Sequence, residues 1–210
     1  VIDVKFNGEI VPGCPKRVTV KQISQPRLAG KLLEAVILNE EASFQLSDIQ
    51  SINDLVIKIK SHTGQELLPK QIQKISPDDY IIKWIPRELG TYSIHVIYGD
   101  QVIKDTPLKI RVFDPNQVKV SQISDGLVFK PNMFCVDASE AGEGSLEIGI
   151  TCNGQFIPNQ VKSIGYSKFE VNFLPQEAQI HLASIKFNGH SINGSPYQIR
   201  IVDSNLVKAN

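Results

Sequence analysis

The segment KFNGHSINGSP, residues 186–196, nearly repeats KFNGEIVPGCP, residues 5–15. A third and looser copy, IYGDQVIKDTP, occupies residues 97–107. The prolines that close the three copies stand at positions 15, 107 and 196, which gives a period of about ninety residues. Such a period is typical of a chain built from repeated structural units. We therefore expect two whole units, preceded by the end of an earlier one.

The repeated segment has the residues of a corner between two β-strands. Its Asn-Gly pairs, at positions 7–8 and 188–189, accept positive φ at little cost and favour a tight turn. The closing proline can occupy the first position of a strand without removing a ladder hydrogen bond. The motif therefore predicts a turn followed by the last strand of each unit.

Short segments between these corners alternate apolar and polar residues, as half-buried strands do. Turn residues such as Ser76 to Asp79 separate them. Helical periodicity extends beyond two turns only in RLAGKLLEAVIL, residues 27–38. Strands at this spacing predict an all-β fold of tandem antiparallel β-sandwiches. The expected strands are residues 43–49, 55–60, 71–75, 80–86, 92–98 and 108–113, then 133–139, 145–151, 160–164, 168–175, 181–187 and 197–203.

Charge and hydropathy exclude several classes of protein. The 210 residues include 22 basic and 22 acidic side chains, so the chain has no basic excess to attract nucleic acid or a membrane surface. No apolar run approaches the length of a membrane span, and no signal-peptide pattern opens the chain. Because the chain begins inside a repeat, we expect it to be a fragment of a longer protein.

The cysteines Cys14, Cys135 and Cys152 are odd in number and form no CxxC pair. They make a poor disulfide framework and a poor zinc site. Three free thiols are typical of a reducing compartment, which favours an intracellular location.

No residue pattern predicts an active site, a cofactor or a metal site. None of the histidines, His62, His95, His181 and His190, has a carboxylate or cysteine at ligand or triad spacing. The glycine pair around Glu143 lacks the strand–loop–helix setting of a phosphate loop. Asn193 begins a formal glycosylation sequon, but the sequon is also the repeat's own corner. We expect Trp84 to be a core residue rather than a ligand platform.

The ordered motifs resemble the immunoglobulin-like rod repeats of the filamin family. The motifs are Gly194-Ser195-Pro196 before the last strand, AGEGSL at residues 141–146, the P…GTYSIHV corner at residues 86–96 and the junction DPNQVKV at residues 114–120. The likeness covers nearly the whole chain. It implies immunoglobulin-like sandwiches from the rod of a cytoplasmic, cytoskeletal scaffold that crosslinks actin. Actin would be bound only by other parts of such a protein.

Two departures from the family pattern affect the expected units. His181 stands where the first unit has Tyr92, so we expect a looser corner there. Pro26 and Gly30 interrupt the first strand of the first unit, and segment lengths place residues 18–21 in the last strand of the earlier unit. The predicted boundaries are residues 1–21 for the end of a preceding repeat, 22–114 and 115–204 for two repeats, and 205–210 for a linker or tail.

An exposed sheet edge can accept a partner peptide as an added strand. The resemblance implies that peptide segments of receptor tails or adaptor proteins dock between the third and fourth strands. Gly149 removes a side chain from the outward face and could admit a peptide, although a bulge would explain it equally well. The first unit is bulkier and more basic there, so we expect a poorer apolar groove. The predicted groove of the second unit comprises Leu146, Glu147, Ile148, Gly149, Ile150, Thr151, Val161, Lys162, Ser163 and Ile164, and the second candidate groove comprises Val56, Lys58, Lys60, Gln71 and Gln73.

The resemblance further implies masking, in which a first strand docks in a neighbour's groove until force withdraws it. Residues 26–38 against the second unit, or residues 118–123 against the first, are the candidate masking strands, and the weaker strand pattern favours residues 26–38. The link at residues 113–117 is too short for a free tether, so the units should lie close together. The alternative to a cytoskeletal rod is an extracellular adhesion ectodomain, which a glycan at Asn193 or a disulfide at Cys135 or Cys152 would favour. A carbohydrate-binding sandwich is a third, and would need an exposed aromatic platform.

Overall fold

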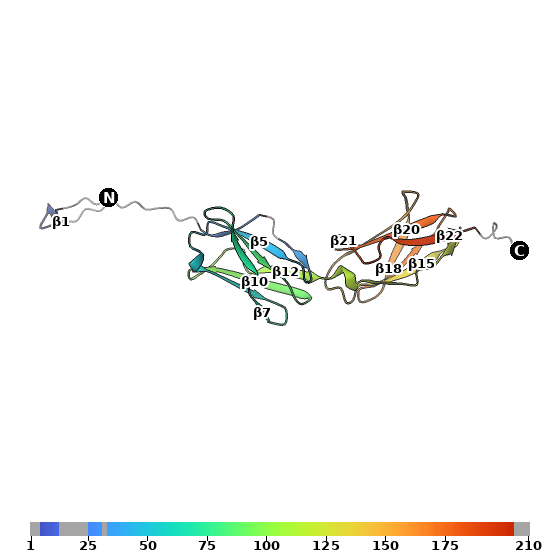
Figure 1. The fold of residues 1–210 in the computed structure, drawn as a ribbon, viewed down its shortest axis with the longest axis horizontal. Helices are drawn as coiled ribbons and strands as arrows, with labels where there is room; N and C mark the ends of the chain where they lie inside the picture. The colour runs from blue at the N-terminus through green and yellow to red at the C-terminus, as the bar shows by residue number, and fades with distance from the viewer. Residues whose placement is uncertain (1–4, 13–24, 31–32, 204–210) are drawn as a thin grey trace.

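The computed structural model describes residues 5–12, 25–30 and 33–203 of the chain. These residues form β-strands and two short 3-10 helices, with no α-helix among them. Figure 1 shows two β-sandwiches placed end to end. The predicted fold class, tandem antiparallel immunoglobulin-like sandwiches, is confirmed.

The first sandwich has one sheet of four strands in the order β3-β5-β9-β8 and a facing sheet in the order β4-β12-β10-β6-β7, with β11 added beside β10. All pairs are antiparallel except β4 with β12. The 3-10 helix η1, Ile52–Asp54, leads into β6. The strands are β3 (Arg27–Ala29), β4 (Ala35–Ile37), β5 (Ala42–Ser47), β6 (Leu55–Lys60), β7 (Glu66–Leu67), β8 (Gln71–Lys74), β9 (Tyr80–Trp84), β10 (Gly90–Tyr98), β11 (Gln101–Val102) and β12 (Leu108–Phe113).

The second sandwich repeats this order strand for strand. Its sheets run β13-β15-β19-β18 and β14-β22-β20-β16-β17, with β21 beside β20. The repeat found in the sequence is therefore a repeat of topology. The strands are β13 (Lys119–Ser121), β14 (Gly126–Leu127), β15 (Asn132–Asp137), β16 (Leu146–Cys152), β17 (Gln155–Ile157), β18 (Asn159–Gly165), β19 (Lys168–Phe173), β20 (Ile180–Phe187), β21 (His190–Ser191) and β22 (Tyr197–Val202).

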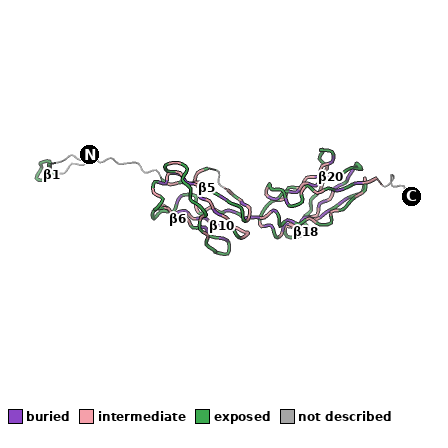
Figure 2. The backbone as a smooth tube through the Cα atoms, viewed as in Figure 1, coloured by how far each residue is buried: buried purple, intermediate pink, exposed green. Residues whose placement is uncertain are grey.

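Each sandwich has its own apolar core, because alternate residues of each strand face the opposite sheet. Figure 2 shows buried backbone along the strands of both sandwiches, and a few loop residues such as Ile49 and Ile103 are buried as well. Tyr80, Ile82 and Trp84 share the inner face of β9, as predicted, and Trp84 is completely buried. The largest fully buried side chains of the two cores are Trp84, Tyr92, Phe113 and Phe134.

The repeated corner is a turn between short strands. Asn188 and Gly189 have φ of 48° and 79° and connect β20 to β21. The first copy turns in the same way, with Asn7 at φ 50° between β1 (Lys5–Phe6) and β2 (Glu9–Ile10). The predicted strand at residues 18–21 lies outside the described residues. The predicted repeat boundaries stay a prediction.

The segment 26–38 differs from expectation. Its described residues, 26–30 and 33–38, are not helical and pair with no strand of the second sandwich, because β3 pairs with β5 and β4 pairs with β12 in its own sandwich. Gly30, at φ +73°, ends β3. The chain then crosses from one sheet to the other, so its two strands share no single alternation. The other candidate is likewise in its own sheet, since β13 pairs with β15.

The two sandwiches meet through a short, structured joint. The 3-10 helix η2, Pro115–Gln117, is capped by the Asp114 carboxylate, which accepts a hydrogen bond from the Asn116 N–H at 3.0 Å. The Asp114 N–H donates to the Ala141 carbonyl at 2.9 Å. A Cβ on Gly142 would lie 2.9 Å from the Val112 carbonyl oxygen, so the absence of a side chain permits this approach. The expectation that the units lie close together is confirmed.

Candidate functional site

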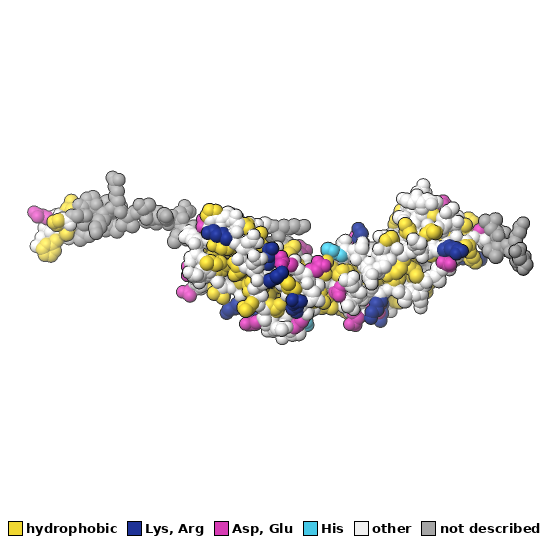
Figure 3. All heavy atoms as spheres, viewed as in Figure 1, with side chains coloured by type: hydrophobic (Ala, Val, Ile, Leu, Met, Phe, Trp, Pro, Cys, Tyr) yellow, Lys and Arg dark blue, Asp and Glu magenta, His cyan; other side chains and the backbone are white. Residues whose placement is uncertain are grey.

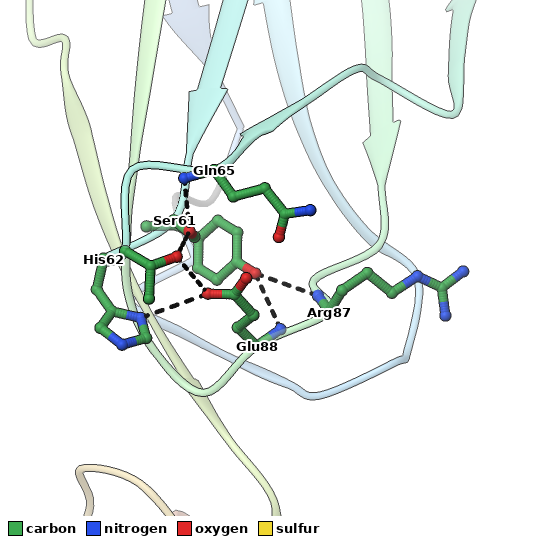
Figure 4. Close-up of polar contacts among 7 residues, drawn as sticks. Ser61, His62, Gln65, Arg87 and Glu88 are labelled. Atoms are coloured by element: carbon green, nitrogen blue, oxygen red, sulfur yellow. Dashed lines mark hydrogen bonds and ion pairs between the residues drawn. The ribbon is translucent and has the colours of Figure 1, made fainter.

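Polar side chains gather at the corner before β10, where Tyr92 is completely buried. The Tyr92 hydroxyl accepts hydrogen bonds from the backbone N–H groups of Arg87 and Glu88, at 3.1 and 3.0 Å. Figure 4 shows the Glu88 carboxylate near His62, whose Nδ1 lies 3.9 Å away. Thr63 donates to the same carboxylate at 2.7 Å. These contacts tie two loops together and form a structural corner.

His181 replaces the tyrosine in the second sandwich and is completely buried. Its Nδ1 lies 3.2 Å from the Gln179 carbonyl oxygen, and its Nε2 has no hydrogen-bond partner among the described residues. The ring packs against Phe173, with centroids 5.9 Å apart. The corner therefore has one side-chain contact to the backbone where Tyr92 makes two, which agrees with the expected looser corner.

Two residues of the formal glycosylation sequon accept hydrogen bonds within the second sandwich. Ser195 of the formal sequon accepts a hydrogen bond from the Ile185 N–H at 2.9 Å, and the Asn193 carbonyl accepts one from the Tyr197 hydroxyl at 2.7 Å. Cys135 and Cys152 are free thiols, and burial is the main cause of the raised pKa of Cys152. Over the described residues, no group of three or more His, Cys, Asp or Glu side chains could hold a metal ion.

Residues 5–12, 25–30 and 33–203 contain no helix that is long and apolar enough to cross a membrane.

The second sandwich has open backbone edges on both sides of one gap between its sheets. β16 pairs with β20 along its whole length, but with β17 only at residues 150–152. In the described part of the chain, residues 146–149 therefore have no strand partner on the side away from β20. Across the gap, β18 is the last strand of the other sheet. We call this gap the second groove.

The first sandwich has the same arrangement. β6 pairs with β7 only at Ile59 and Lys60, so residues 55–58 have a free edge in the described structure. β8 is the last strand of the facing sheet. We call the gap between β6 and β8 the first groove.

Each sandwich has one inward-pointing apolar side chain on its fourth strand that is incompletely covered. Val161 of β18 is paired with the fully buried Val171, and Ile72 of β8 with the fully buried Ile82. Paired residues on neighbouring strands point to the same side of a sheet, so Val161 and Ile72 point inward. They are nevertheless 48% and 42% exposed. An apolar side chain on the edge strand that borders each groove therefore remains partly exposed to solvent.

The structure distributes the predicted residues of the second groove over three environments. Leu146 and Ile148 point inward and are partly buried against the core, whereas Ile150 is fully buried within it. On the outer face of β16 lie Glu147, Gly149 and Thr151, and on β18 Lys162, Ser163 and Ile164 are exposed with Val161.

Gly149 lies in an unbroken register with β20, opposite Ser184, so a bulge does not explain it. A Cβ at this position would meet no atom within 4 Å. The glycine leaves a flat area on the outer face of β16, next to its free edge.

The residues predicted for the first groove lie around its mouth rather than along its lining. Val56, Lys58 and Lys60 are on the outer face of their sheet, opposite Ile97, His95 and Ser93. Gln71 and Gln73 are on the outer face of the other sheet, opposite Lys83 and Ile81. The lining residues Leu55, Ile57 and Ile72 were not predicted, although the alternation in LVIKIK and QIQKI carries the signal.

Comparison with known proteins gives a consistent set of relatives. Residues 112–198 match the model of the Filamin/ABP280 repeat. Filamin-C of Rattus norvegicus is 26% identical over 211 residues, which cover 94% of this chain and 8% of that protein. Filamin-A of Drosophila melanogaster is 24% identical over 218 residues, which cover 96% of this chain and 10% of that protein.

Among solved structures, the Lin-41 filamin domain aligns with a TM-score of 0.38 and 12% identity, over 41% of this chain and 90% of that domain. The chain spans no more than about a tenth of the length of the two curated relatives.

Proposed function

We propose that this chain is built from filamin-family repeats and that its two sandwiches act as a spacer and as docking sites for partner peptides, which add a strand beside β6 or β16. The parent protein would be a cytoplasmic, cytoskeletal scaffold that crosslinks actin through other parts of its chain. Its partners would be segments of receptor tails or adaptor proteins. The proposal assigns no catalysis, cofactor or metal to these residues, and no binding of nucleic acid.

The observation that carries this proposal is the exposure of Ile72 and Val161. Both side chains point into a sandwich and are still almost half exposed. Each lies across a groove from a strand edge whose backbone groups are unpaired over about four residues. An added strand would satisfy that edge and bury these side chains at the same time.

Main-chain hydrogen bonds and the burial of apolar side chains both contribute free energies of a size that suits reversible docking. Each main-chain hydrogen bond contributes about 0.5–1.5 kcal/mol net. Burial of apolar side chains contributes roughly 25 cal/mol per Å². Ordering of the peptide opposes these terms, so micromolar affinity is the expected range.

Masking by a first strand is not part of this proposal, because residues 26–38 and β13 are paired within their own sandwiches. Among the described residues, neither β3, β4 nor β13 is added to β6 or β16 as a further strand.

An NMR titration with a synthetic peptide of about nine residues, with valine at every second position and threonine between, tests the proposal. We expect amide shifts in β16 and β18, or in β6 and β8, that saturate. Val161→Asp should remove the shifts in the second sandwich, because a carboxylate would occupy an apolar groove. Gln160→Asp is the matched control, since Gln160 lies on the outer face of the same strand, opposite Asn172.

Saturating shifts at other strands, or equal affinity in a folded Val161→Asp variant, would remove the second groove as the docking site. Ile72→Asp and Gln73→Asp form the same pair of test and control in the first sandwich.

A further inference from the structure

We propose that the two grooves select peptides by charge, so that the first groove prefers a strand with acidic residues on its solvent side and the second groove does not. This inference depends on the proposed function, because it concerns the chemistry of the peptides that dock there. The observations that carry it are the side chains at equivalent positions of the two grooves.

The pairing registers align the two grooves residue by residue. Tyr92 and His181 occupy equivalent corners of the two sandwiches. Lys58 pairs with His95, three residues after Tyr92, and Gly149 pairs with Ser184, three residues after His181, so Lys58 and Gly149 are equivalent. The same alignment places Val56 with Glu147 and Lys60 with Thr151.

The fourth strands align in the same way. Pro86 and Pro175 each accept a hydrogen bond from the loop before the second strand, so Ile82 and Val171 are equivalent. Ile72 then corresponds to Val161, and Lys74 to Ser163. The inward-facing apolar residue is kept in both grooves, whereas the charged residues are not.

Each strand that borders the first groove contains a lysine, Lys58 on the outer face of β6 and Lys74 on the inner side of β8, where it pairs with Tyr80. Lys58 is exposed on β6 beside the free edge, and no direct ion pair of Lys58 is found in the described residues. Across the groove, the Lys74 ammonium lies 5.8 Å from the centroid of the Tyr80 ring. Residues 55–58 and 71–75, which form the groove walls, contain no acidic side chain.

The acidic side chain of the adjoining strand β7 already has a partner. Glu66 of β7 accepts a hydrogen bond from Lys60 at 2.9 Å, which is the main cause of its lowered pKa. The charge of Lys58 lowers the pKa of Glu66 further, from a greater distance. On β6 and β7, two lysines, Lys58 and Lys60, therefore share the single carboxylate of Glu66. A carboxylate on an incoming strand would give Lys58 an ionic partner of its own.

The second groove lacks these cations. Gly149 replaces Lys58, Ser163 replaces Lys74, and Glu147 places a negative charge where the first groove has Val56. On the face drawn in Figure 3, Lys and Arg side chains are more frequent over the first sandwich than over the second. The cations that remain near this edge each have an acidic neighbour, since Lys186 lies opposite Glu147 and Lys162 lies opposite Glu170. A peptide rich in carboxylates should therefore gain less here than at the first groove.

Strand geometry decides which peptide positions meet the cations. In a strand added beside residues 55–58, alternate side chains point inward, against Leu55, Ile57 and Ile72. The others lie on the outer face, where directly opposed side chains are about 4.5–5.5 Å apart at Cβ. A glutamate at an outer position would therefore lie beside Lys58. The fitting peptide alternates apolar residues with acidic ones.

Two synthetic peptides of about nine residues test the inference, both with valine at every second position. One has glutamate at the positions between, and the other has glutamine. We expect the glutamate peptide to bind the first sandwich about two- to fivefold more tightly at low salt, as one exposed ion pair with Lys58 allows. The advantage should shrink as salt is raised, because these charges are exposed to solvent. The second sandwich should show no preference for glutamate.

Exchange of the charges between the grooves gives the decisive variants. Lys58→Glu should reverse the preference of the first sandwich, whereas Lys130→Glu, with the same change in net charge on the second sandwich, should leave it unchanged. Gly149→Lys should create a preference for the glutamate peptide in the second sandwich. A lysine is accommodated there because a Cβ at Gly149 meets no atom within 4 Å.

The outcomes separate this inference from the proposed function. If both peptides bind the first groove equally, or if Lys58→Glu leaves the ratio unchanged in a folded protein, the charge preference is wrong and peptide docking stands. If neither peptide shifts any amide of either groove, the docking function fails and the inference fails with it.

Discussion

Trp84 shows how one residue organises the first core. Its ring is completely buried and lies 5.2 Å from the ring of Tyr92, whose hydroxyl holds the adjacent loop. The indole Nε1 has no hydrogen-bond partner among the described residues. Packing, rather than polar bonding, is therefore the contribution of this side chain. His181 contributes less at the other corner, because its ring has a single polar contact with the backbone.

Trp84→Ala should lower the free energy of unfolding of the first sandwich by about 3–5 kcal/mol, because it leaves a large cavity between the sheets. Urea unfolding followed by NMR signals of β9 and β10 measures the change. Val102→Ala is the control, since Val102 is 59% exposed. Equal effects of the two substitutions would contradict the assigned packing of β9.

At the scale of strands, one acidic side chain connects β15 to β19. The Asp137 carboxylate accepts hydrogen bonds from the Ser139 hydroxyl and N–H, at 2.6 and 3.0 Å, and lies 2.9 Å from the Lys168 ammonium. The bond from the Ser139 hydroxyl, then the bond from Lys168, lowers the pKa of Asp137 to about 2. The ionised carboxylate is thus favoured in the folded state.

Because the folded-state pKa is depressed, the stabilising contribution of Asp137 is present above its ordinary pKa of about 3.9 and is lost as pH falls toward 2. Asp137→Asn should therefore destabilise the second sandwich at pH 6 and have little effect near pH 2. Denaturant midpoints at the two pH values measure this difference. Glu143→Gln, in a loop of the same sandwich, is the control. An equal loss for Asp137→Asn at both pH values would show that its charge does not matter.

At the scale of the whole molecule, Phe113 belongs to one sandwich by sequence and to the other by packing. It ends β12, yet it is almost fully buried with the second core. Its ring centroid lies 5.8 Å from that of Phe187 and 5.6 Å from that of His190. Ala35 and Ile37 of β4 pack against the same core. The joint is therefore an extension of the second core.

Phe113→Ala should destabilise the second sandwich by about 3–5 kcal/mol, although the residue lies in the last strand of the first. It should also loosen the relative orientation of the two sandwiches. Hydrogen exchange of β20 and β22 measures the first effect, and residual dipolar couplings measure the second. Leu108→Ala, at the other end of β12, should affect the first sandwich instead, because Leu108 packs against that core. Unchanged exchange in β20 would contradict a shared core.

The sequence by itself determined the repeat, the strands and their inner faces, because these depend on local alternation and on turn residues. Trp84, Ile82 and Tyr80 could be assigned to one face from period two alone. Residues 26–38 could not, since their strands pair in two different sheets and follow no single pattern. Phe113 gave no signal either, because its burial depends on a neighbour that is distant in sequence.

Only the tertiary structure decided how far the side chains along the two grooves are covered. Groove residues alternate like those of any half-buried strand, so their sequence does not show how far apart two edges from different sheets lie. That separation follows from the packing of the sheets, and it leaves Ile72 and Val161 exposed although both point inward. Lys58 and Lys74 likewise belong to strands of different sheets, β6 and β8, so local sequence cannot show how their charges are placed relative to one another.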